Sequence, residues 1–547
     1  MSFYHKVVDT AVSSTYCSNH RVLAGAFMQL GNQVKGVRVS LDSNDSVAKA
    51  AHKEGQLRPN AIGLWGVLFF VVAFSAPITA MTANSPIAVA YGNGIYAPAG
   101  FIFACVVLTI FSIGFVAMAR HITSAGAFYT FVSRGIGKPI GFGAGWLSTA
   151  AYISIEAALI GVLSVFTDTL MVTQFNITLP WVVYAVIAIL LIGFLSYRDI
   201  SVAARVLGVV LIIEIALLSI MAFAVLFKGG GPDGLMLETL NPVKAFTALP
   251  ENFEGTGVGA GVAGIGLLFA FWSWVGFEAT AIFGEESKDP KKIVPRATMI
   301  AVVGIGVFYT FITWMAIAGN GAAAAVSLSA SATPFELLYT PMATFVGAWG
   351  VTGFQFFVVG GSFACALAIH NSATRYLFAF GRDGLLPKAM GRSHPKYQSP
   401  YFASTTQTVI TLVFIVGAYI TGVDPYMGLY TVGAIFATVC LLSAQTLTAV
   451  ACVWYFHVKK MHPETANVFR TILAPIIGGA GMLYVVYLVL LNIDFATGGQ
   501  GDLPIVQVLP WLVLGVMVVP TVLALWWKSS KPHLYDRIGS SVFTHSD

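Results

Sequence analysis

Three acidic residues, Glu156, Glu214 and Glu278, lie inside long apolar stretches of this 547-residue chain. A charge at the centre of a lipid bilayer costs about 2.5–3.5 kcal/mol on insertion-type scales, so each acid needs a physical reason for its position. One reason is reversible proton binding, because a proton removes the charge and an apolar medium favours the neutral form. The alternative is a glutamate hydrogen-bonded to backbone or serine groups of neighbouring helices. These residues therefore suggest reversible proton binding as the chemistry of the protein.

One of these acids belongs to a polar stripe. Ser148, Tyr152 and Glu156 follow one another at intervals of four residues. Residues spaced in this way lie on one face of an α-helix. We predict that this face borders a cavity and that Tyr152 and Glu156 belong to a binding site; packing between helices is the alternative.

Two apolar segments contain residues that interrupt helices. Residues 76–86 hold two prolines and four hydroxyl or amide side chains, and residues 264–278 hold glycines, a serine and an acid. Unpaired backbone groups are tolerated in a membrane only where they are buried in protein or line a cavity. We therefore expect unwound segments around 79–82 and 271–273 to face one central cavity, although ordinary Pro or Gly kinks are the alternative. The side chains expected there are Thr79, Ala80, Met81, Thr82, Tyr152, Glu156, Phe271, Trp272 and Ser273.

A pair of broken helices can bind a small zwitterion. The N-terminus of a half-helix offers N–H groups and a positive dipole to a carboxylate, whereas the carbonyls freed at C-terminal ends accept hydrogen bonds from an ammonium group. Paired interrupted segments in corresponding halves of a chain are a known sign of a transport site.

The composition predicts the elements that position these residues. Charged residues make up 10% of the chain, hydrophobic residues 57%, and the mean hydropathy is +0.80, which is typical of an all-α integral membrane protein. We expect a cytoplasmic tail over 1–60, a transmembrane domain over 61–527 and a second cytoplasmic tail over 528–547. Twelve transmembrane helices are predicted, near 62–91, 98–119, 139–172, 180–197, 202–227, 257–283, 297–319, 343–380, 402–422, 428–457, 471–492 and 506–527.

The distribution of basic residues supports that count. With both termini on the cytoplasmic side, 27 of the 29 Lys and Arg residues fall in the cytoplasmic tails and loops or near the cytoplasmic ends of the adjoining helices, and Lys228 and Lys244 are the exceptions. The net charge of +5 therefore reflects membrane orientation, and no basic soluble domain is left to bind nucleic acid. Ten histidines show no metal-ligand spacing, and no nucleophile motif or phosphate-binding glycine loop is present, so we expect neither an enzyme nor a cofactor.

Several motifs resemble the amino acid, polyamine and organocation superfamily of permeases. They are Gly276-Phe277-Glu278, residues 284–290 with 293–297, Ala125 to Tyr129 with Arg134 to Gly137, and His370-Asn371 through Pro387. The resemblance covers roughly residues 62–527. It implies a five-plus-five inverted-repeat (LeuT-like) transporter fold with two additional C-terminal helices, alternating access, and a substrate bound between helices one, three, six and eight.

The resemblance also bears on individual residues. Relatives in the cationic amino acid transporter branch have a lysine at the position of Glu214, so the acid here implies a proton site, or a cation site shared with Ser362. Glu278 ends the Gly-Phe-Glu motif and is either a structural anchor or a gating proton site. Trp272 matches a Trp-Ser pair of the arginine and agmatine exchanger branch, which implies a cover over the substrate; a packing role is the alternative. The family commonly has Gly-Ser-Gly where this chain has Thr79-Ala80-Met81.

Together these observations favour secondary-active transport of an amino acid or related small organic amine across the cell membrane. We expect a coupling proton (H+), with Na+ as the alternative. The expected partners are the small-molecule substrate and the lipid bilayer, without nucleic acid. Sodium-coupled or exchange transport of a polyamine or cationic amino acid remains open, as does a transporter-like sensor or channel. The oligomeric state is left open.

Overall fold

The computed structural model describes residues 62–124, 126–198, 200–247, 262–282, 284–493 and 504–540, without the side chains of 200–207 and 285. The chain divides into two units, Met1–Gln56 and Leu57–Asp547, and all described residues belong to the second. The predicted N-terminal tail over 1–60 lies outside the described residues.

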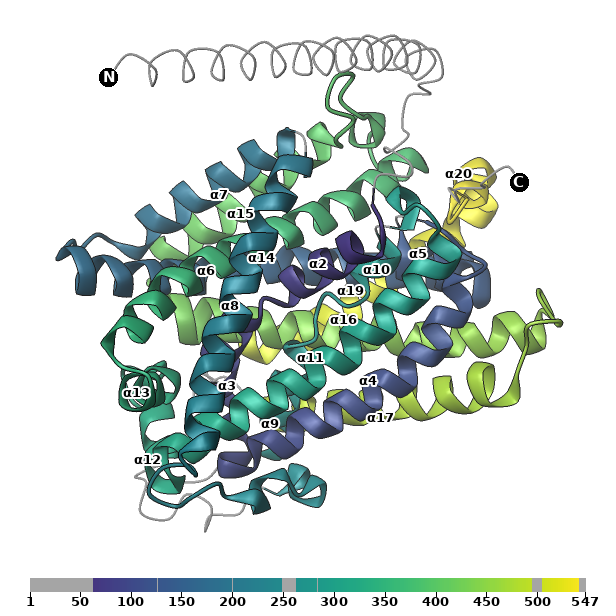
Figure 1. The fold of residues 1–547 in the computed structure, drawn as a ribbon. Coiled ribbons are helices and arrows are strands. Elements are labelled where there is room, and N and C mark those ends of the chain that lie inside the picture. The colour runs from purple at the N-terminus through teal and green to yellow at the C-terminus, as the bar shows by residue number, and fades with distance from the viewer. Residues whose placement is uncertain are drawn as a thin grey trace, which may run out of the picture. The chain divides into compact units, whose positions relative to one another are not determined.

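The described residues form helices joined by turns and short loops, and they contain no β-strand (Figure 1). The longer helices are α2 (Leu64–Ser75), α3 (Pro77–Ile87), α4 (Ala97–Ala119), α5 (Ala127–Gly135), α6 (Lys138–Leu170), α7 (Trp181–Tyr197), α8 (Ile200–Phe227), α9 (Ala263–Trp272), α11 (Pro290–Asn320), α12 (Ala322–Ser329), α13 (Glu336–Phe345), α14 (Ala348–Arg382), α15 (Tyr401–Ile420), α16 (Thr431–Val453), α17 (Ala474–Leu491) and α19 (Pro504–Ser530). Shorter elements used below are η1 (Ala88–Asn93), η9 (Pro425–Tyr430), α10 (Ala279–Ile282) and α20 (Pro532–Arg537).

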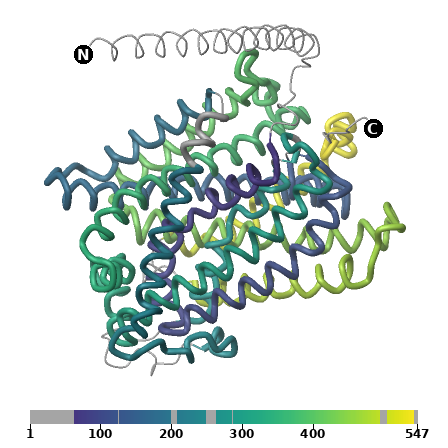
Figure 2. The backbone as a smooth tube through the Cα atoms, in the orientation of Figure 1, coloured from purple at the N-terminus to yellow at the C-terminus, as the bar shows by residue number. Residues whose placement is uncertain are grey.

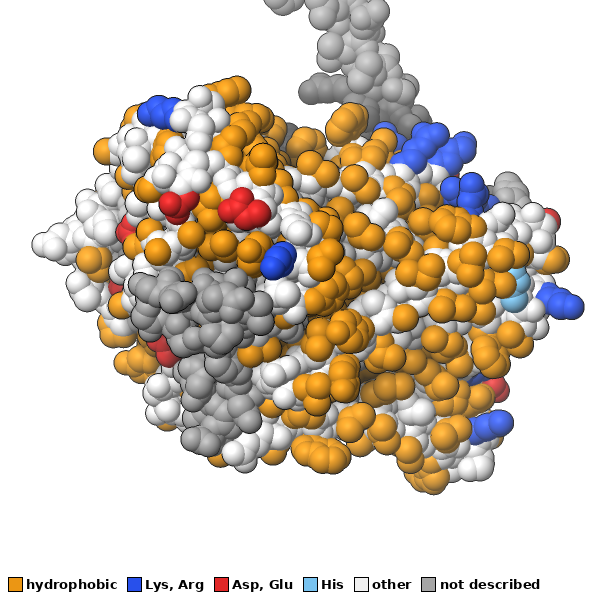
Figure 3. All heavy atoms as spheres, turned by 90° about the horizontal axis from the view of Figure 1, so that it is seen from below, with side chains coloured by type: hydrophobic (Ala, Val, Ile, Leu, Met, Phe, Trp, Pro, Cys, Tyr) orange, Lys and Arg blue, Asp and Glu red, His pale blue; other side chains and the backbone are white. Residues whose placement is uncertain are grey.

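Nine helical segments among the described residues are long and apolar enough to cross a membrane. The first of them, Leu64–Ala119, contains both α3 and α4, and the chain turns back between these two helices (Figure 2). Two shorter apolar helices, α7 and α9, accompany the nine. Hydrophobic side chains cover much of the face in Figure 3, as a surface in contact with lipid requires. The chain is therefore a multi-pass membrane protein.

The first predicted break lies between α2 and α3. Ala76 has φ 39° and ψ 76°, a left-handed conformation that is unfavourable for a residue with a Cβ. Pro77 then takes the first position of α3, where its missing N–H costs nothing and its fixed φ suits the helix. The prediction that residues 79–82 are unwound is wrong, because these residues continue α3. The break lies at Ala76, three residues before the predicted segment begins, because Pro77 already starts the second half-helix.

The second predicted break follows α9. This helix ends at Trp272, so the prediction that residues 271–273 are unwound is wrong for Phe271 and Trp272. Residues 273–278 form turns before the four-residue α10 begins at Ala279. Gly276 has φ 115°, a conformation that side chains rarely adopt. A Cβ at this position would lie 2.0 Å from Cδ1 of Phe74, so only glycine allows α2 to approach this closely.

Both broken helices lie in the interior of the bundle (Figures 1 and 2). Helix α2 packs against α8, α11 and α14, and α3 contacts the same three helices and α9. Helix α6 packs against α14 and α16 across the bundle. Because the interrupted helices are surrounded by other helices, their unpaired backbone groups find partners away from lipid.

Candidate functional site

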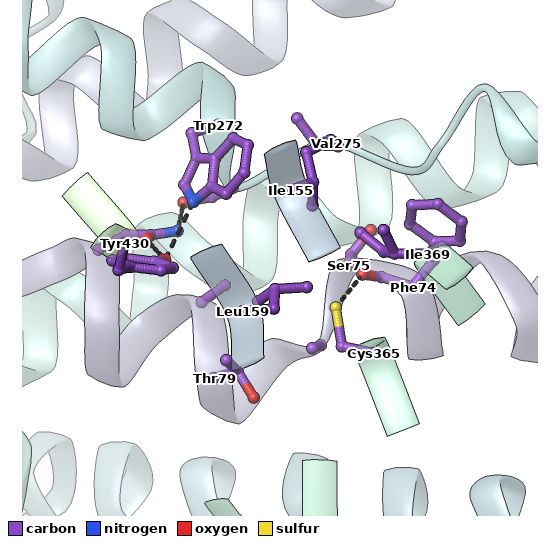
Figure 4. A pocket seen from close by; sticks show the side chains of 14 residues that line it. Phe74, Ser75, Thr79, Ile155, Leu159, Trp272, Val275, Cys365, Ile369 and Tyr430 are labelled. Atoms are coloured by element: carbon purple, nitrogen blue, oxygen red, sulfur yellow. Dashed lines mark hydrogen bonds between the residues drawn. The ribbon is translucent and has the colours of Figure 1, made fainter. Parts of the chain in front are cut away.

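The ends of the broken helices meet at a small cavity of about 30 Å³ (Figure 4). A site needs roughly 10–15 Å³ to hold one water molecule, so this cavity has room for about two and is too small for an amino acid in this conformation. Its lining comes from α2, α3, α6, α9, α14 and η9, and consists of Phe74, Ser75, Ala76, Thr79, Ala80, Asn84, Ile155, Leu159, Trp272, Ser273, Val275, Cys365, Ile369 and Tyr430.

A hydrogen-bonded aromatic group closes one side of the cavity. The indole N–H of Trp272 donates to the hydroxyl of Tyr430 at 3.0 Å, and that hydroxyl donates to Oδ1 of Asn84. The Asn84 amide in turn donates to Oγ of Ser273 at 2.8 Å. Tyr430 also stacks on Tyr426, with ring centroids 5.8 Å apart. These contacts join α3, α9 and η9 into one partition, which we name the Trp272–Tyr430 partition.

A second set of aromatic side chains closes the opposite side. Phe74, which lines the cavity, meets Tyr152 edge to face, with ring centroids 5.9 Å apart. The Tyr152 hydroxyl donates to Oε1 of Glu278 at 2.6 Å, and the Gly276 N–H donates to Oε2 of the same acid at 3.1 Å. Tyr152 stacks on Tyr376 with centroids 5.5 Å apart. Glu278 is fully buried and holds α6 against the unwound segment that follows α9.

The backbone groups freed at the first break have side-chain partners. The thiol of Cys365 donates to the Phe74 carbonyl at 2.9 Å, and the hydroxyl of Tyr309 donates to the Ser75 carbonyl at 2.7 Å. On the other side of the break, the Ile78 N–H at the start of α3 donates to the carboxyl group of Glu214. Side chains of three helices, α14, α11 and α8, thus bind the backbone groups on both sides of the break.

Glu214 sits where a carboxylate is electrostatically favoured, beside the N-terminus of a half-helix. It is 2% exposed, and its Oε2 has no hydrogen-bond partner among the described residues. Gly361 of α14 makes the space for it, since a Cβ there would lie 2.4 Å from Oε1 of the acid. The next residue, Ser362, shares a 2.8 Å hydrogen bond with Thr79. The predicted coupling residues Glu214 and Ser362 therefore lie on neighbouring sides of the same break.

The residues predicted for substrate binding separate into two groups. Thr79, Ala80, Trp272 and Ser273 line the cavity. The others do not line it in this conformation. Met81 accepts hydrogen bonds from Ser85 and Thr313, and the Thr82 hydroxyl donates to the Ile78 carbonyl. Phe271 packs against Phe103, Tyr152 donates to Glu278, and Glu156 faces α14 and α15. Since α3 is helical over 77–87, successive residues point in different directions, and only part of the predicted run faces one cavity.

Glu156 belongs to a separate buried network. Its Oε1 lies 2.7 Å from Nδ1 of His370, and its Oε2 accepts from the Gln407 amide at 2.5 Å. His370 continues through Nε2 to Ser404 at 3.0 Å, and Ser404 donates to Ser196 at the same distance. The network joins α6, α14, α15 and α7. Of the polar stripe on α6, Glu156 therefore faces an interface between helices, whereas Tyr152 faces the aromatic contacts beside the cavity.

Sequence reasoning missed several residues of the cavity. Tyr430 is one of twenty tyrosines, and nothing in its neighbourhood distinguishes it. Cys365 and Ile369 are spaced by four on α14 and follow Ser362, so the helical period from that serine was a usable signal. Asn84 is one of the polar side chains of the first interrupted segment, and this was a signal for its place at the cavity.

Comparison with known proteins identifies the family of this chain. The model of the family "Amino acid permease" matches residues 66–531. An uncharacterized transporter of Rhizobium meliloti is 27% identical over 58% of this chain and 64% of its own length, so the match spans somewhat less than two thirds of that relative. The branched-chain amino acid permease BcaP of Bacillus subtilis is 24% identical over 76% of this chain and 83% of its own length. The low-affinity putrescine importer PlaP of Escherichia coli K12 is 22% identical over 56% and 64%.

These relatives are named as a transporter, a permease and an importer, and none of the three as an enzyme. The family match covers most of the residues between the first and last apolar helices, and it includes both breaks and the cavity between them. The chain therefore belongs to the amino acid permease family.

Proposed function

We propose that this protein is a secondary-active transporter that carries an amino acid or a related small organic amine by alternating access. The observation that carries the proposal is a central cavity bounded by the ends of two broken helices and closed on both sides by aromatic contacts. A closed cavity between two separable partitions is the occluded state that an alternating-access cycle needs.

The proposed architecture is twelve membrane-spanning helices, ten of them in two five-helix inverted repeats and two accessory. Taking α2–α3 and α4 as separate spans and adding α7 and α9–α10 to the remaining long helices supports the count of twelve. The two broken spans are then the first and the sixth, which are corresponding positions of two five-helix repeats. This correspondence is the pattern expected when a substrate site lies at the interface of the repeats.

The proposed substrate pose follows from the polar groups around the cavity. The N-terminus of α3 suits the substrate's carboxylate, while the hydroxyls of Thr79 and Ser273 and the oxygen of Asn84 can accept hydrogen bonds from its ammonium group. Trp272 offers an aromatic surface to the remaining side chain of the substrate. The names of BcaP and PlaP, a branched-chain amino acid permease and a putrescine importer, support an amino acid or amine as the substrate class.

The proposed coupling residue is Glu214, with a proton as the coupling ion. Its contact with the Ile78 N–H at the start of α3 supports this role, because gain or loss of a proton changes the charge beside the helix break. Glu278 and Ser362 are secondary candidates: Glu278 through its bonds to Tyr152 and Gly276 on the closed side, and Ser362 through its bond to Thr79. The distribution of Lys and Arg supports a plasma or inner membrane protein with both termini in the cytoplasm.

The deciding experiment is uptake into proteoliposomes made with the full-length protein. Labelled leucine, lysine and putrescine are offered with a proton gradient, with a sodium gradient and with no gradient. Accumulation of at least one substrate that depends on the proton gradient is expected. Accumulation that follows sodium would move the proposal to a cation site formed by Glu214, Thr79 and Ser362, whose oxygens lie around the break. Ligand binding without any flux would favour a sensor instead.

A further inference from the structure

A second and larger cavity lies outside the Trp272–Tyr430 partition. Its volume is about 470 Å³, which is within the range of small-molecule sites. Four aromatic residues and two acids give it its character: Tyr91, Trp181, Phe335, Tyr426, Asp168 and Asp424. No Lys, Arg or His is among the described residues that line it. We name it the outer cavity, because the proposed orientation puts this end of the bundle outside the cell.

A tyrosine pair separates the outer cavity from the central one. Tyr426 lines the outer cavity and Tyr430 lines the central cavity, and their rings are stacked at an interplanar angle of 13°. Tyr426 is held in place by its hydroxyl, which donates to the Ala83 carbonyl at 2.7 Å, and by an edge contact with Phe335. A molecule in the outer cavity is therefore one aromatic layer away from the central cavity.

The two acids of the outer cavity, Asp168 and Asp424, differ in their hydrogen bonding. Oδ1 of Asp168 is buried and has no hydrogen-bond partner in the described part of the chain. Oδ1 of Asp424 caps η9 by accepting from the N–H groups of Tyr426 and Met427 at 2.9 and 2.6 Å. As a residue, Asp168 is only partly buried and lines the cavity, so its carboxylate can pair with a ligand that brings N–H donors and positive charge.

The charged residues at this end of the bundle also favour a cationic ligand. The described connections between the long helices here carry four acids and two basic residues, namely Asp233, Glu238, Glu336, Asp424, Lys228 and Lys244. A fifth acid, Asp168, lies in the last turn of α6. In the view of Figure 3, acidic side chains gather on the left and basic ones mainly on the right. An acidic cavity mouth raises the local concentration of cations and disfavours anions. Aromatic faces add attraction for an ammonium group once it has entered.

We propose that the outer cavity is a binding site for organic cations that carry a primary ammonium group, and that it selects them before the Trp272–Tyr430 partition opens. This inference rests on the proposed transport function, whose substrate class it narrows to molecules with net positive charge. Asp168 provides the counter-charge, and Tyr91, Trp181, Phe335 and Tyr426 provide the aromatic walls.

The test is equilibrium binding of labelled putrescine and labelled leucine to the purified full-length protein. Putrescine is doubly cationic, whereas leucine carries a carboxylate that the acids repel. The variant Asp168→Asn removes the charge and keeps an oxygen acceptor at the same place. Glu238→Gln is the matched control, because it removes an exposed acid at the same end of the bundle that does not line the cavity. Trp272→Leu alters the lining of the central cavity and replaces no residue that lines the outer one.

We expect Asp168→Asn to weaken putrescine binding about tenfold and leucine binding by less than twofold. Glu238→Gln should leave the affinity for both ligands unchanged, and Trp272→Leu should retain the putrescine binding that is weakened in Asp168→Asn. Raising the ionic strength from about 0.01 M to about 0.1 M shortens the Debye length from about 30 Å to about 10 Å, so putrescine binding should also weaken with salt.

Equal putrescine affinity in Asp168→Asn and the parent protein would overturn the proposal, as would an equal loss for putrescine and leucine. Failure of the transport proposal looks different: the parent protein would bind putrescine through Asp168 but move no substrate in the proteoliposome assay. Normal flux together with unchanged putrescine binding in Asp168→Asn would reject the outer site and leave transport intact.

Discussion

Nδ1 of His370 lies 2.7 Å from Oε1 of Glu156, and neither side chain is exposed. The two residues come from α14 and α6, and Gln407 of α15 completes the contact. A buried acid and base in hydrogen-bond contact stabilise each other mainly by removing the cost of burying either one alone. The pair is therefore best explained as a connection between helices, separate from the substrate cavity.

Removing the acid tests this explanation. Glu156→Ala leaves His370 and the Gln407 amide without their acceptor, so we expect the free energy of unfolding to fall by about 3 kcal/mol. Glu156→Gln restores an acceptor and should lose clearly less. Thermal unfolding of the purified protein, followed by intrinsic fluorescence, measures both. Glu464→Gln, which changes an exposed loop acid, is the control. An alanine variant as stable as the control would show that the network contributes nothing.

Glu214→Gln tests the coupling proposal. Glutamine keeps the shape of the protonated acid and an oxygen acceptor for the Ile78 N–H, but it cannot titrate. We expect proton-driven accumulation to be lost while exchange of labelled for unlabelled substrate persists, since exchange needs no net proton movement. Uptake with an imposed proton gradient and counterflow without one separate the two activities.

The control for this prediction is Glu238→Gln, which removes an exposed acid that does not line the central cavity. If Glu214→Gln still concentrates substrate with the pH dependence of the parent protein, the coupling role passes to Glu278. That acid is the remaining fully buried carboxylate beside an unwound segment of the cavity region.

Trp272→Leu tests the aromatic cover of the substrate. The change removes the indole ring from the cavity and the hydrogen bond to Tyr430, so we expect the half-saturating substrate concentration to rise about tenfold. Trp511→Leu is the control, because Trp511 is 72% exposed on α19. Initial uptake rates over a range of substrate concentrations give the comparison. An unchanged half-saturating concentration for every transported substrate would assign Trp272 to packing alone.

Gly276→Ala tests the close approach of the two breaks. The added Cβ meets the Phe74 ring and requires a left-handed φ of 115°, so one of the two segments must move. We expect the free energy of unfolding to fall by about 1–3 kcal/mol, with loss of uptake. Gly304→Ala is the matched change in an open position of α11, where a Cβ meets nothing within 4 Å. Melting curves and uptake that match those of Gly304→Ala would contradict the expected clash.

The sequence by itself determined the class of protein and the approximate course of its helices. Apolar stretches long enough to span a bilayer are a local property, because every backbone group in lipid must be satisfied within its own helix. The same reasoning located both interrupted segments within a few residues, since Pro77 and the glycines around 264–276 act on the backbone next to them.

Only the tertiary structure decided which side chains share the cavity. Helical period groups Ser148, Tyr152 and Glu156 on one face, but it cannot say that Tyr152 meets Glu278 while Glu156 meets His370. The exact position of the first break also depends on partners distant in sequence, since Cys365, Tyr309 and Glu214 satisfy the groups that it frees. A residue's direction follows from its own helix, whereas what it touches depends on how neighbouring helices pack, and that information is spread over the whole chain.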